Sequence, residues 1–337
     1  MKPTDFAKYL TEFFSVYLSI QKNVSKNTIK SYRDMFKLLI RYCQEMKKIP
    51  AERITMNILS DQLITDFLLW LETDRKCSIS TRNQRLAAIH SFFRYVQSED
   101  PSAIFYFQKV IAIPLKKAKK IVMEHLSPEA MKLLLNQPDR NTPKGRRHLA
   151  LMSVLYDSGA RVQELIDIRV CDVTIEVPAV ITLIGKGNKI RRVPIMKNTA
   201  SLLRSYLLEN KLDKPWKNEY PLFTNNQHNK LTKEGVAYII GKYVESARET
   251  STIVPPRVKP HMFRHSKSLH LLQAGVNLIY IRDFLGHVDL KTTEIYARTD
   301  TETKRKAIEN AYPDLIDSNL PDWNKDQVLL SWLSELK

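Results

Sequence analysis

The chain has 337 residues and a formal net charge of +17, from 53 Lys and Arg against 36 Asp and Glu. It is long enough for two domains with separate cores, and its 43% of hydrophobic residues is typical of a globular protein. The N-terminus lacks an apolar signal core, and no apolar run reaches membrane-spanning length. The charge favours a polyanionic partner such as nucleic acid, and a merely basic protein is the alternative.

The cysteines argue against both disulfide bonds and a bound metal. Cys43, Cys77 and Cys171 are far apart and lack zinc spacing, so neither a disulfide framework nor a metal site is predicted. They are typical of small core residues in a reducing compartment. Together with the excess of basic residues, this predicts a cytoplasmic protein that associates with the nucleoid.

Residues 1–110 predict a helical domain. Apolar side chains recur at helical spacing in four segments between Asp5 and Gln97, and Ser25 and Ser78 are expected helix starts. Basic and polar residues also lie along the second and fourth helices. A solvated surface would explain either set alone, but together they favour helices that enter a major groove. The candidate DNA contacts are Lys30, Arg33, Lys37, Arg41, Arg82, Asn83 and Arg85.

Residues 111–125 are expected to form a linker. Pro114 breaks regular structure, and four lysines follow within five positions, so the segment repels itself and stays extended. A flexible tether is one interpretation, and a strap laid across a DNA backbone is the other. The lysines concerned are Lys116, Lys117, Lys119 and Lys120.

A second domain of mixed α/β type is expected over residues 126–312. Ser127 followed by Pro128 is a strong helix start, and a helix from about Gly145 is expected to end at Gly159. Residues 177–195 change to the alternating period of a β-hairpin whose turn is at 185–188. Further helices are expected at 202–208, 236–247 and 261–274.

Some side chains in this domain could carry chemistry. His261 and Arg264 share a helix face, and a tyrosine near such cations suggests attack on a phosphodiester. His261 and His265 have zinc-ligand spacing, but Met262 replaces the catalytic Glu of a metalloprotease motif and no clear third ligand follows. His265 and His270 are expected to be structural. The turn at 185–188 does not match a phosphate-binding loop, so neither ATP nor another cofactor is expected.

Five motifs in order resemble those of the tyrosine recombinases, the phage-integrase family. They are Ser158-Gly-Ala-Arg161-Val-Gln-Glu164, Gly185-Lys186-Gly-Asn-Lys-Ile-Arg-Arg-Val-Pro, His261-Met-Phe-Arg264-His, Leu285-Gly-His287 and Thr293-Glu-Ile-Tyr296. Each motif is weak alone, but five in the family's order are specific. The resemblance implies a core-binding (SAM-like) bundle before the catalytic domain. The polar run Ser266–His270 departs from the more apolar family pattern and affects how that helix packs.

The resemblance also implies roles for these residues. Arg161 and Arg264 would clamp the phosphate, and Tyr296 would attack it to form a 3′-phosphotyrosyl bond without metal or ATP. His261 would assist as base, Lys186 would protonate the leaving 5′-oxygen, and His287 would donate to a non-bridging oxygen. Glu164 would orient Arg161 or His261. Lys189 is the alternative to Lys186.

Residues 313–337 form a tail with an amphipathic helical pattern, from Val328 to Leu336. It either packs on its own domain or docks on a neighbouring protomer. We expect a recombinase that acts as a homo-tetramer on DNA sites through a Holliday junction, with accessory DNA-bending or partner recombinase proteins. Mobile-element integration or excision is favoured over dimer resolution or inversion. A monomeric topoisomerase of the same chemistry and a non-catalytic basic DNA-binding protein are the alternatives.

Overall fold

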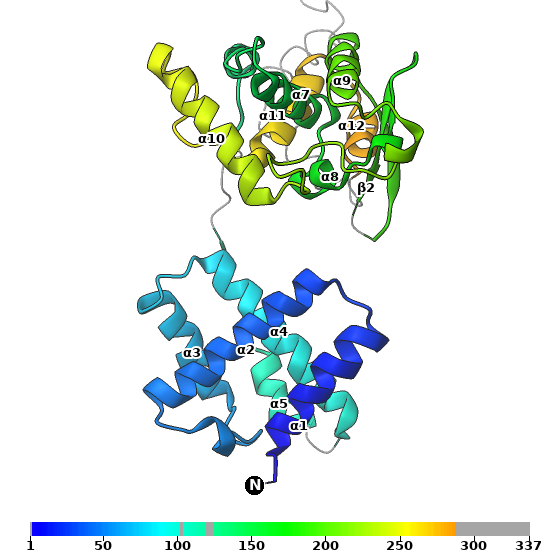
Figure 1. Cartoon of the computed structure of the whole chain (residues 1–337). Coiled ribbons are helices and arrows are strands. Elements are labelled where there is room, and N and C mark those ends of the chain that lie inside the picture. Colours follow the sequence, from blue (N-terminus) through cyan, green and yellow to red (C-terminus); the bar gives the residue numbers. More distant parts are fainter. Residues whose placement is uncertain (1, 102–103, 119–123, 186, 287–337) are drawn as a thin grey trace, which may run out of the picture. The chain divides into compact units, whose positions relative to one another are not determined.

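The structure is a computed structural model that describes residues 2–101, 104–118, 124–185 and 187–286. Within them the chain is mostly helical with one small antiparallel sheet (Figure 1). The predicted fold class, mainly α with a small β element, is confirmed. The chain divides into two compact units, Met1–Ile121 and Val122–Lys337. Among the described helices, none has both the length and the apolarity needed to cross a membrane.

The first unit is a bundle of helices. The predicted serine caps are confirmed, since Ser25 Oγ accepts a hydrogen bond from the amide of Thr28 and Ser78 Oγ from that of Thr81, both at 3.2 Å. The elements are α1 (Asp5–Glu12), a π-helical segment (Phe13–Gln21), α2 (Lys26–Met46), a 3₁₀ turn (Ala51–Arg53), α3 (Asp61–Thr73), α4 (Ile79–Glu99) and α5 (Ile104–Ile111).

Aromatic side chains form the centre of this bundle. Phe13, Phe36 and Phe92 are buried, with the ring centroids of Phe13 and Phe92 5.4 Å apart and those of Phe36 and Phe92 5.0 Å apart. Their near-perpendicular ring planes match the edge-to-face geometry that aromatic pairs prefer. Since these rings come from the π-helical segment, α2 and α4, they fix the two basic helices relative to each other.

The sequence did not predict α5. This helix has only eight residues, too few to show a helical period clearly. It packs on α4 through Phe107, whose ring centroid lies 5.1 Å from that of Phe93. The helix ends at Ile111, the first residue of the predicted linker.

The second unit holds the remaining helices and the sheet. Ser127 caps α6 through the amide of Ala130 with Pro128 in the first turn, as predicted. The elements are α6 (Pro128–Leu135), α7 (Pro143–Ser158), α8 (Val162–Asp167), a 3₁₀ turn (Val170–Asp172), β1 (Val173–Thr174), β2 (Val180–Ile184), β3 (Ile190–Pro194), α9 (Lys197–Glu209), a 3₁₀ turn (Pro215–Lys217), α10 (Lys233–Thr250), α11 (Pro260–Gln273) and α12 (Leu278–Leu285).

The sheet has the strand order β1-β2-β3 and is antiparallel throughout. The predicted hairpin is confirmed as β2 and β3, in which Ile181 pairs with Val193 and Leu183 with Arg191. Ile181, Leu183 and Val193 are buried, so one face of the hairpin packs on the domain. The short strand β1 was not predicted, because two residues carry no period.

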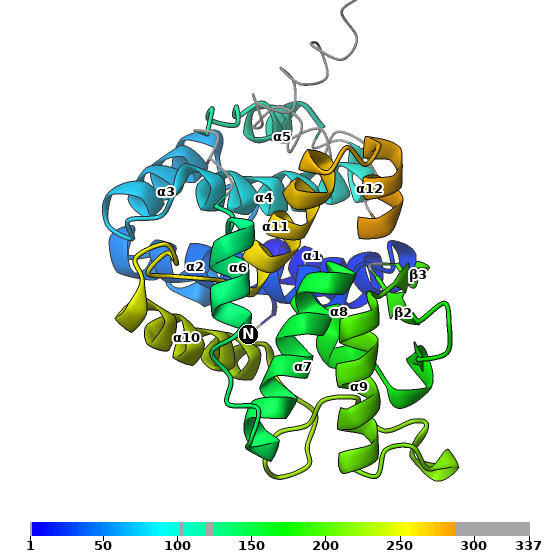
Figure 2. The same ribbon diagram turned by 90° about the horizontal axis from the view of Figure 1, so that it is seen from above.

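Helix α7 runs through the core of the second unit. Its residues Leu151, Met152, Val154 and Leu155 are fully buried, so the helix is covered on several sides. It contacts α6, α8, α9 and α11, and Figure 2 shows α9 running beside it. The end of α7 is thereby held in place, and the first arginine motif begins at that end.

The polar run Ser266–His270 on α11 is fully accommodated. Ser266 Oγ donates to the carbonyl of Met262 at 2.7 Å and accepts from the amide of Leu126 at 2.8 Å. The His270 ring lies between the carbonyl of Leu126, at 2.9 Å from Nε2, and the hydroxyl of Tyr156, at 2.8 Å from Nδ1. The structural role predicted for His270 is confirmed, since it helps to fasten the start of the second unit to α11.

Candidate active site

Arg161 lies just after the end of α7. The helix ends at Gly159, whose φ of 57° is in the left-handed region that favours glycine. A Cβ at Gly159 would also meet side-chain atoms of Phe284 at 3.0 Å and of Leu285 at 3.1 Å. Glycine therefore permits both the turn and the close approach of α12. The chain then places Arg161 at the N-cap of α8.

Glu164 is bonded to Arg161, one of the two residues that it was predicted to orient. Its Oε2 accepts from the backbone amide of Arg161 and its Oε1 from Nη1 of the Arg161 guanidinium, both at 2.8 Å. The Glu164 side chain is 4% exposed and that of Arg161 is 35% exposed. The carboxylate is therefore an internal support, while Arg161 remains accessible to a ligand in solution.

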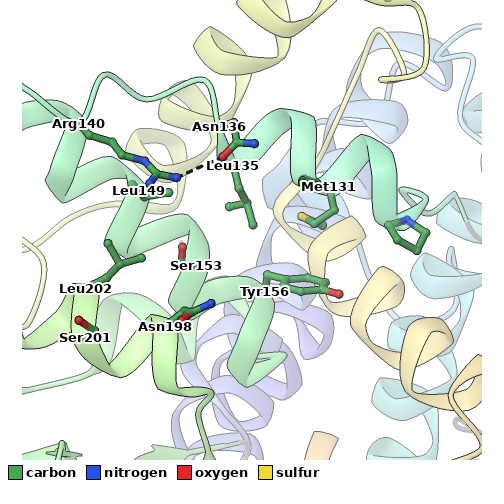
Figure 3. Close-up of a pocket in the computed structure, with 12 residues that line it drawn as sticks. Met131, Leu135, Asn136, Arg140, Leu149, Ser153, Tyr156, Asn198, Ser201 and Leu202 are labelled. Carbon is green, nitrogen blue, oxygen red and sulfur yellow. Dashed lines mark hydrogen bonds between the residues drawn. The ribbon is translucent and has the colours of Figure 1, made fainter.

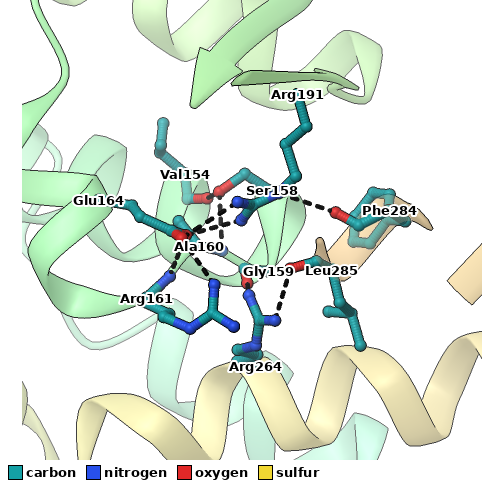
Figure 4. A network of polar contacts seen from close by, with 10 residues as sticks. All are labelled: Val154, Ser158, Gly159, Ala160, Arg161, Glu164, Arg191, Arg264, Phe284 and Leu285. Carbon is teal, nitrogen blue, oxygen red and sulfur yellow. Dashed lines mark hydrogen bonds and ion pairs between the residues drawn. The ribbon is translucent and has the colours of Figure 1, made fainter. Parts of the chain in front are cut away.

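Arg264 comes from α11 and is buried. Figure 4 shows its guanidinium between two backbone carbonyls, with Nη1 donating to Gly159 at 2.7 Å and Nη2 to Leu285 at 2.6 Å. These bonds join the end of α7, the end of α12 and the second turn of α11 at one point. The first and second arginine motifs are thus brought together, although Gly159 and Arg264 are 105 positions apart in the sequence.

A third arginine, which the sequence analysis did not single out, completes the group. Arg191 of β3 donates to Glu164 from Nη1 at 3.1 Å and from Nη2 at 2.6 Å, and its Nε donates to the carbonyl of Phe284 at 3.1 Å (Figure 4). We call Arg161, Glu164, Arg191 and Arg264 the arginine cluster. The signal was present in the sequence, since strand alternation places Arg191 on the same face as the buried Val193.

The ionisation of Glu164 follows from these contacts. Burial by itself raises the pKa of this carboxyl, because a desolvated anion is disfavoured. Hydrogen bonds from Arg191 and from the Arg161 amide and side chain, together with the charge of Arg191, outweigh burial and lower the pKa of Glu164 to about 2. Glu164 is therefore an anion at any pH at which the protein would work.

His261 lies in the first turn of α11 and is exposed at its surface. Partial desolvation of the ring, followed by the positive charges of Arg264, Arg161 and Lys233, lowers the pKa of His261 below its ordinary value of 6.5. The ring is therefore neutral at neutral pH and can accept a proton. Its centroid lies 6.5 Å from that of His265. Of the residues described, no three His, Cys, Asp or Glu gather in a way that could hold a metal ion.

Three predicted site residues, Lys186, His287 and Tyr296, lie outside the described residues. The elements that lead to them are described. The hairpin turn around Lys186 is closed by a hydrogen bond from the Gly185 amide to the Lys189 carbonyl at 2.8 Å. Helix α12 ends at Gly286, whose φ is 64°. The hairpin and α12 both lie next to the arginine cluster, because Arg191 belongs to β3 of the hairpin and bonds to the carbonyl of Phe284 in α12.

The basic residues predicted on α2 lie at the surface. Lys30, Arg33, Lys37 and Arg41 are all exposed, and the ion pairs made by Arg33 and Arg41 are long, at 3.6 and 3.8 Å. The start of α2 also faces the start of α4 across a polar groove of about 310 Å³, which both Lys30 and Arg85 line. This surface offers cations and hydrogen-bonding groups from two helices.

The prediction for Arg82 is corrected. Its side chain is 6% exposed, and it donates to the carbonyl of Pro114 at 3.0 Å and pairs with Glu72. Asn83 is likewise occupied, since its amide exchanges two hydrogen bonds with the backbone of Lys116. These side chains fasten residues 114–116 to α4 instead of facing a ligand, because a buried guanidinium requires internal partners.

The remaining linker residues divide into two groups. Lys116 donates from Nζ to both carboxylate oxygens of Glu72 at 2.8 Å, and Lys117 is exposed. Lys119 and Lys120 lie outside the described residues. The predicted strap of lysines is therefore fixed at its first position by the helical bundle.

A separate concave surface lies elsewhere on the second unit. Figure 3 shows this groove of about 620 Å³, lined from α6, α7 and α9. Its wall includes Leu135, Leu149, Tyr156 and Leu202, and no member of the arginine cluster. The groove is therefore distinct from the candidate active site.

Two family models match the chain. The model described as "Phage integrase family" matches residues 124–303, and the model described as "Phage integrase, N-terminal SAM-like domain" matches residues 11–100. The first match contains the arginine cluster and extends past Tyr296. The chain therefore carries both parts of the family's architecture in the order that the sequence predicted.

Individual relatives agree with the models. The integrase/recombinase y4rC of Sinorhizobium fredii is 33% identical over 337 residues, which cover 99% of each chain. The tyrosine recombinase XerD of Listeria monocytogenes serotype 4b is 30% identical over 290 residues, covering 85% of this chain and 93% of the relative. A solved Tn1549 transposon integrase bound to transposon right end DNA shares the fold, with a TM-score of 0.69 and 16% identity over 89% of this chain and 98% of that one.

The match to y4rC covers 99% of the chain, and the first family model contains the arginine cluster. The chain belongs to the phage integrase family and is a tyrosine-type site-specific DNA recombinase.

Proposed function

We propose that the chain cuts and rejoins DNA through a covalent bond between Tyr296 and a 3′-phosphate. The observation that carries this proposal is the convergence of Arg161 and Arg264, since Arg264 holds the carbonyl of Gly159 two residues before Arg161. Two guanidiniums from distant parts of the chain are thus fixed near His261, whose pKa is lowered by burial and then by both charges. This arrangement suits a site for a phosphodiester anion.

The arginines stabilise the charge that develops during the reaction. A phosphodiester is negatively charged and repels nucleophiles, and its transition state places more charge on the non-bridging oxygens. Guanidiniums that are already fixed in place can bind those oxygens without reorganising as the reaction proceeds. The internal bonds of Arg264 and the support of Arg161 by Glu164 provide such fixed positions.

The covalent step would use the remaining predicted residues. The phenol oxygen of Tyr296 attacks phosphorus, the bond from phosphorus to the 5′-oxygen breaks, and the DNA becomes linked to the enzyme through its 3′-phosphate. His261, neutral in this structure's environment, accepts the phenol proton or assists its removal. Lys186 protonates the leaving 5′-oxygen, and His287 donates to a non-bridging oxygen. A 5′-hydroxyl from the same or another strand reverses the step and releases Tyr296.

We further propose that DNA is held by the exposed basic residues Lys30, Arg33, Lys37 and Arg41 of α2, with Arg85 across the groove and Lys116, Lys117, Lys119 and Lys120 in the linker. Arg82 is excluded because it is buried, and Asn83 because both ends of its side-chain amide are bonded to the Lys116 backbone. Phosphate contacts from such residues give affinity and register, while base edges in the major groove give specificity.

At the level of the cell, we propose a homo-tetramer that exchanges strands through a Holliday junction to integrate or excise a mobile element. The similarity to a protein named as an integrase/recombinase, over nearly the full length, supports this role. Residues 1–110, 111–125, 126–312 and 313–337 would act as the core-binding domain, linker, catalytic domain and docking tail. The protein would act on the nucleoid in the cytoplasm, with accessory DNA-bending or partner recombinase proteins.

The covalent intermediate provides the test. Duplexes selected from a random-sequence pool by binding to the full chain are labelled, and nicks are introduced at successive positions of one strand. A nick beside the cleavage point lets the short fragment diffuse away, so the intermediate accumulates. We expect an adduct that resists denaturation, that disappears in Tyr296→Phe and that persists in Tyr280→Phe, which alters an exposed tyrosine of α12. An adduct that persists in Tyr296→Phe contradicts the proposal.

A further inference from the structure

Arg191 is the member of the arginine cluster that the five motifs do not assign to the reaction. It pairs with Leu183 in the hairpin and lies on the domain-facing side of β3 with Val193. Its side chain is 11% exposed. A guanidinium at such a position is unfavourable unless its donors are bonded, so its contacts have to account for its presence.

Every nitrogen of this guanidinium has a partner. Nη1 and Nη2 form a fork on the two oxygens of Glu164, at 3.1 and 2.6 Å, and Nε donates to the Phe284 carbonyl at 3.1 Å. A forked arginine–carboxylate pair restricts both groups in distance and in orientation. Arg191 therefore fixes the plane of the Glu164 carboxylate.

The same carboxylate supports Arg161. Glu164 accepts from the Arg161 amide and from Arg161 Nη1, each at 2.8 Å. It thus lies between a buried guanidinium on one side and an accessible one on the other. Among the described residues, Arg161 would be the one remaining cation bonded to this carboxylate without Arg191. Arg161 would then be drawn toward the anion and would offer less positive charge to a phosphate.

Arg191 also contacts the end of α12. Gly286 caps this helix with a φ of 64°, and a Cβ there would meet Cδ of Arg191 at 3.0 Å and its Nη1 at 3.2 Å. The backbone of α12 can approach the guanidinium only because residue 286 is glycine. With the bond to Phe284, this packing fixes the segment from which His287 follows.

We propose that Arg191 is a positioning residue of the recombination site, which sets Arg161 through Glu164 and holds the end of α12 that leads to His287. The inference rests on the proposed function of these residues. Arg191 acts through other groups, while its strand continues the hairpin that carries Lys186. One side chain thereby links the three segments that supply Arg161, Lys186 and His287.

The test compares Arg191→Met with Arg192→Met, in which the next residue of β3 is exposed and the same charge is lost. Adduct formation is timed on the nicked duplex at saturating protein, and DNA affinity is measured separately. We expect Arg191→Met to slow adduct formation by about 10- to 100-fold, the usual effect of losing a group that orients a reacting one. Its DNA affinity should equal that of Arg192→Met.

Two further variants separate positioning from folding. Arg191→Lys keeps the charge but cannot form the fork, so it should restore only part of the rate. Glu164→Gln/Arg191→Met should lose less rate than the product of the two single losses, because part of the effect of Arg191 passes through that carboxylate. If Arg191→Met does not fold, the rate of adduct formation is compared between Arg191→Lys and wild type, and Arg191→Lys should be slower.

The outcomes are distinguishable. Equal rates for Arg191→Met and Arg192→Met, a loss confined to DNA affinity, or additive losses in the double variant would overturn the positioning role. Absence of any adduct with the wild-type chain would instead overturn the proposed function, and the positioning role with it.

Discussion

Arg264 Nη1 donates a hydrogen bond of 2.7 Å to the carbonyl oxygen of Gly159, which ends α7 just before Arg161. The other terminal nitrogen of Arg264 binds the carbonyl of Leu285 at the end of α12. One buried side chain thus donates to carbonyls at two helix ends, where such groups have no partner within their own helix. The position of each arginine motif therefore depends on the other.

Replacing Arg264 with Met should destabilise the second unit as well as abolish adduct formation. The carbonyls of Gly159 and Leu285 would lose their partners in a buried environment, at about 1–3 kcal/mol for each. Urea unfolding of the full chain measures this change. Arg257→Met, at an exposed position, is the control and should leave the free energy of unfolding close to that of wild type. Equal stability of Arg264→Met and wild type would contradict the structural role.

The stability of the second unit should depend on pH through Glu164. The folded-state pKa of Glu164, about 2, lies below the ordinary value of 4.5, so its contribution is fully present above pH 4.5 and is lost as pH falls toward 2. The loss across this window should be on the order of 3 kcal/mol.

Glu164→Gln provides the comparison, since it cannot titrate. Urea unfolding at a series of pH values below 4.5 should show a shallower decline for this variant than for wild type. Parallel declines for the two proteins would mean that Glu164 does not gain its stability from the arginines.

The rate of adduct formation should depend on pH through His261. The folded pKa lies below 6.5, so the ring stays neutral as pH falls to 6.5 and becomes protonated only at lower pH. The rate should therefore decline as the pH drops below 6.5. This decline, the acidic limb of the pH profile, should be absent from the slower variant His261→Gln. Removal of a nearby cation in Lys233→Gln should move the limb upward toward 6.5. An unchanged limb in His261→Gln would assign the titration to another group.

The exposed and buried basic residues of the first unit should behave differently toward DNA. The triple change Lys30→Gln/Lys37→Gln/Arg41→Gln should reduce the slope of log affinity against log salt by about 3, because each phosphate contact contributes about 0.9. Arg82→Met should leave the slope unchanged and lower the stability of the bundle, since this side chain is buried against Glu72 and Pro114.

Fluorescence anisotropy of a labelled random-sequence duplex, titrated with the full chain at several salt concentrations, measures this slope. A slope that is unchanged in the triple variant would show that DNA lies elsewhere on the protein. A reduced slope in Arg82→Met would show that this residue leaves its internal partners to bind phosphate.

Local signals predicted much of the fold. Ser25, Ser78 and Ser127 cap helices where their side chains can satisfy free amides, and Gly159 ends α7 in a conformation that favours glycine. The short elements α5, α12 and β1 were missed, because few residues show no clear period. Their positions depend on packing with distant segments, such as α5 on α4.

The sequence predicted some residues of the site and missed or misplaced others. The family resemblance implied that Glu164 supports Arg161 or His261, and the structure shows its contact with Arg161. Arg191 was overlooked because a charged residue in a strand next to another arginine is ordinarily taken as solvated, and only its neighbours Glu164 and Phe284 show otherwise. Arg82 gave the opposite error, since its charge suggested DNA while its helix face is buried.

The most direct measurement is the identity of the atom that holds the DNA. The adduct formed on the nicked duplex is digested with nuclease and trypsin, and the modified peptide is identified by mass spectrometry. Cleavage after Lys291 and Arg298 isolates Tyr296 as the single tyrosine of peptide 292–298. We predict a nucleotide 3′-phosphate on this peptide and a free 5′-hydroxyl on the released strand. A nucleotide on any other peptide, or a link through a 5′-phosphate, would contradict the mechanism.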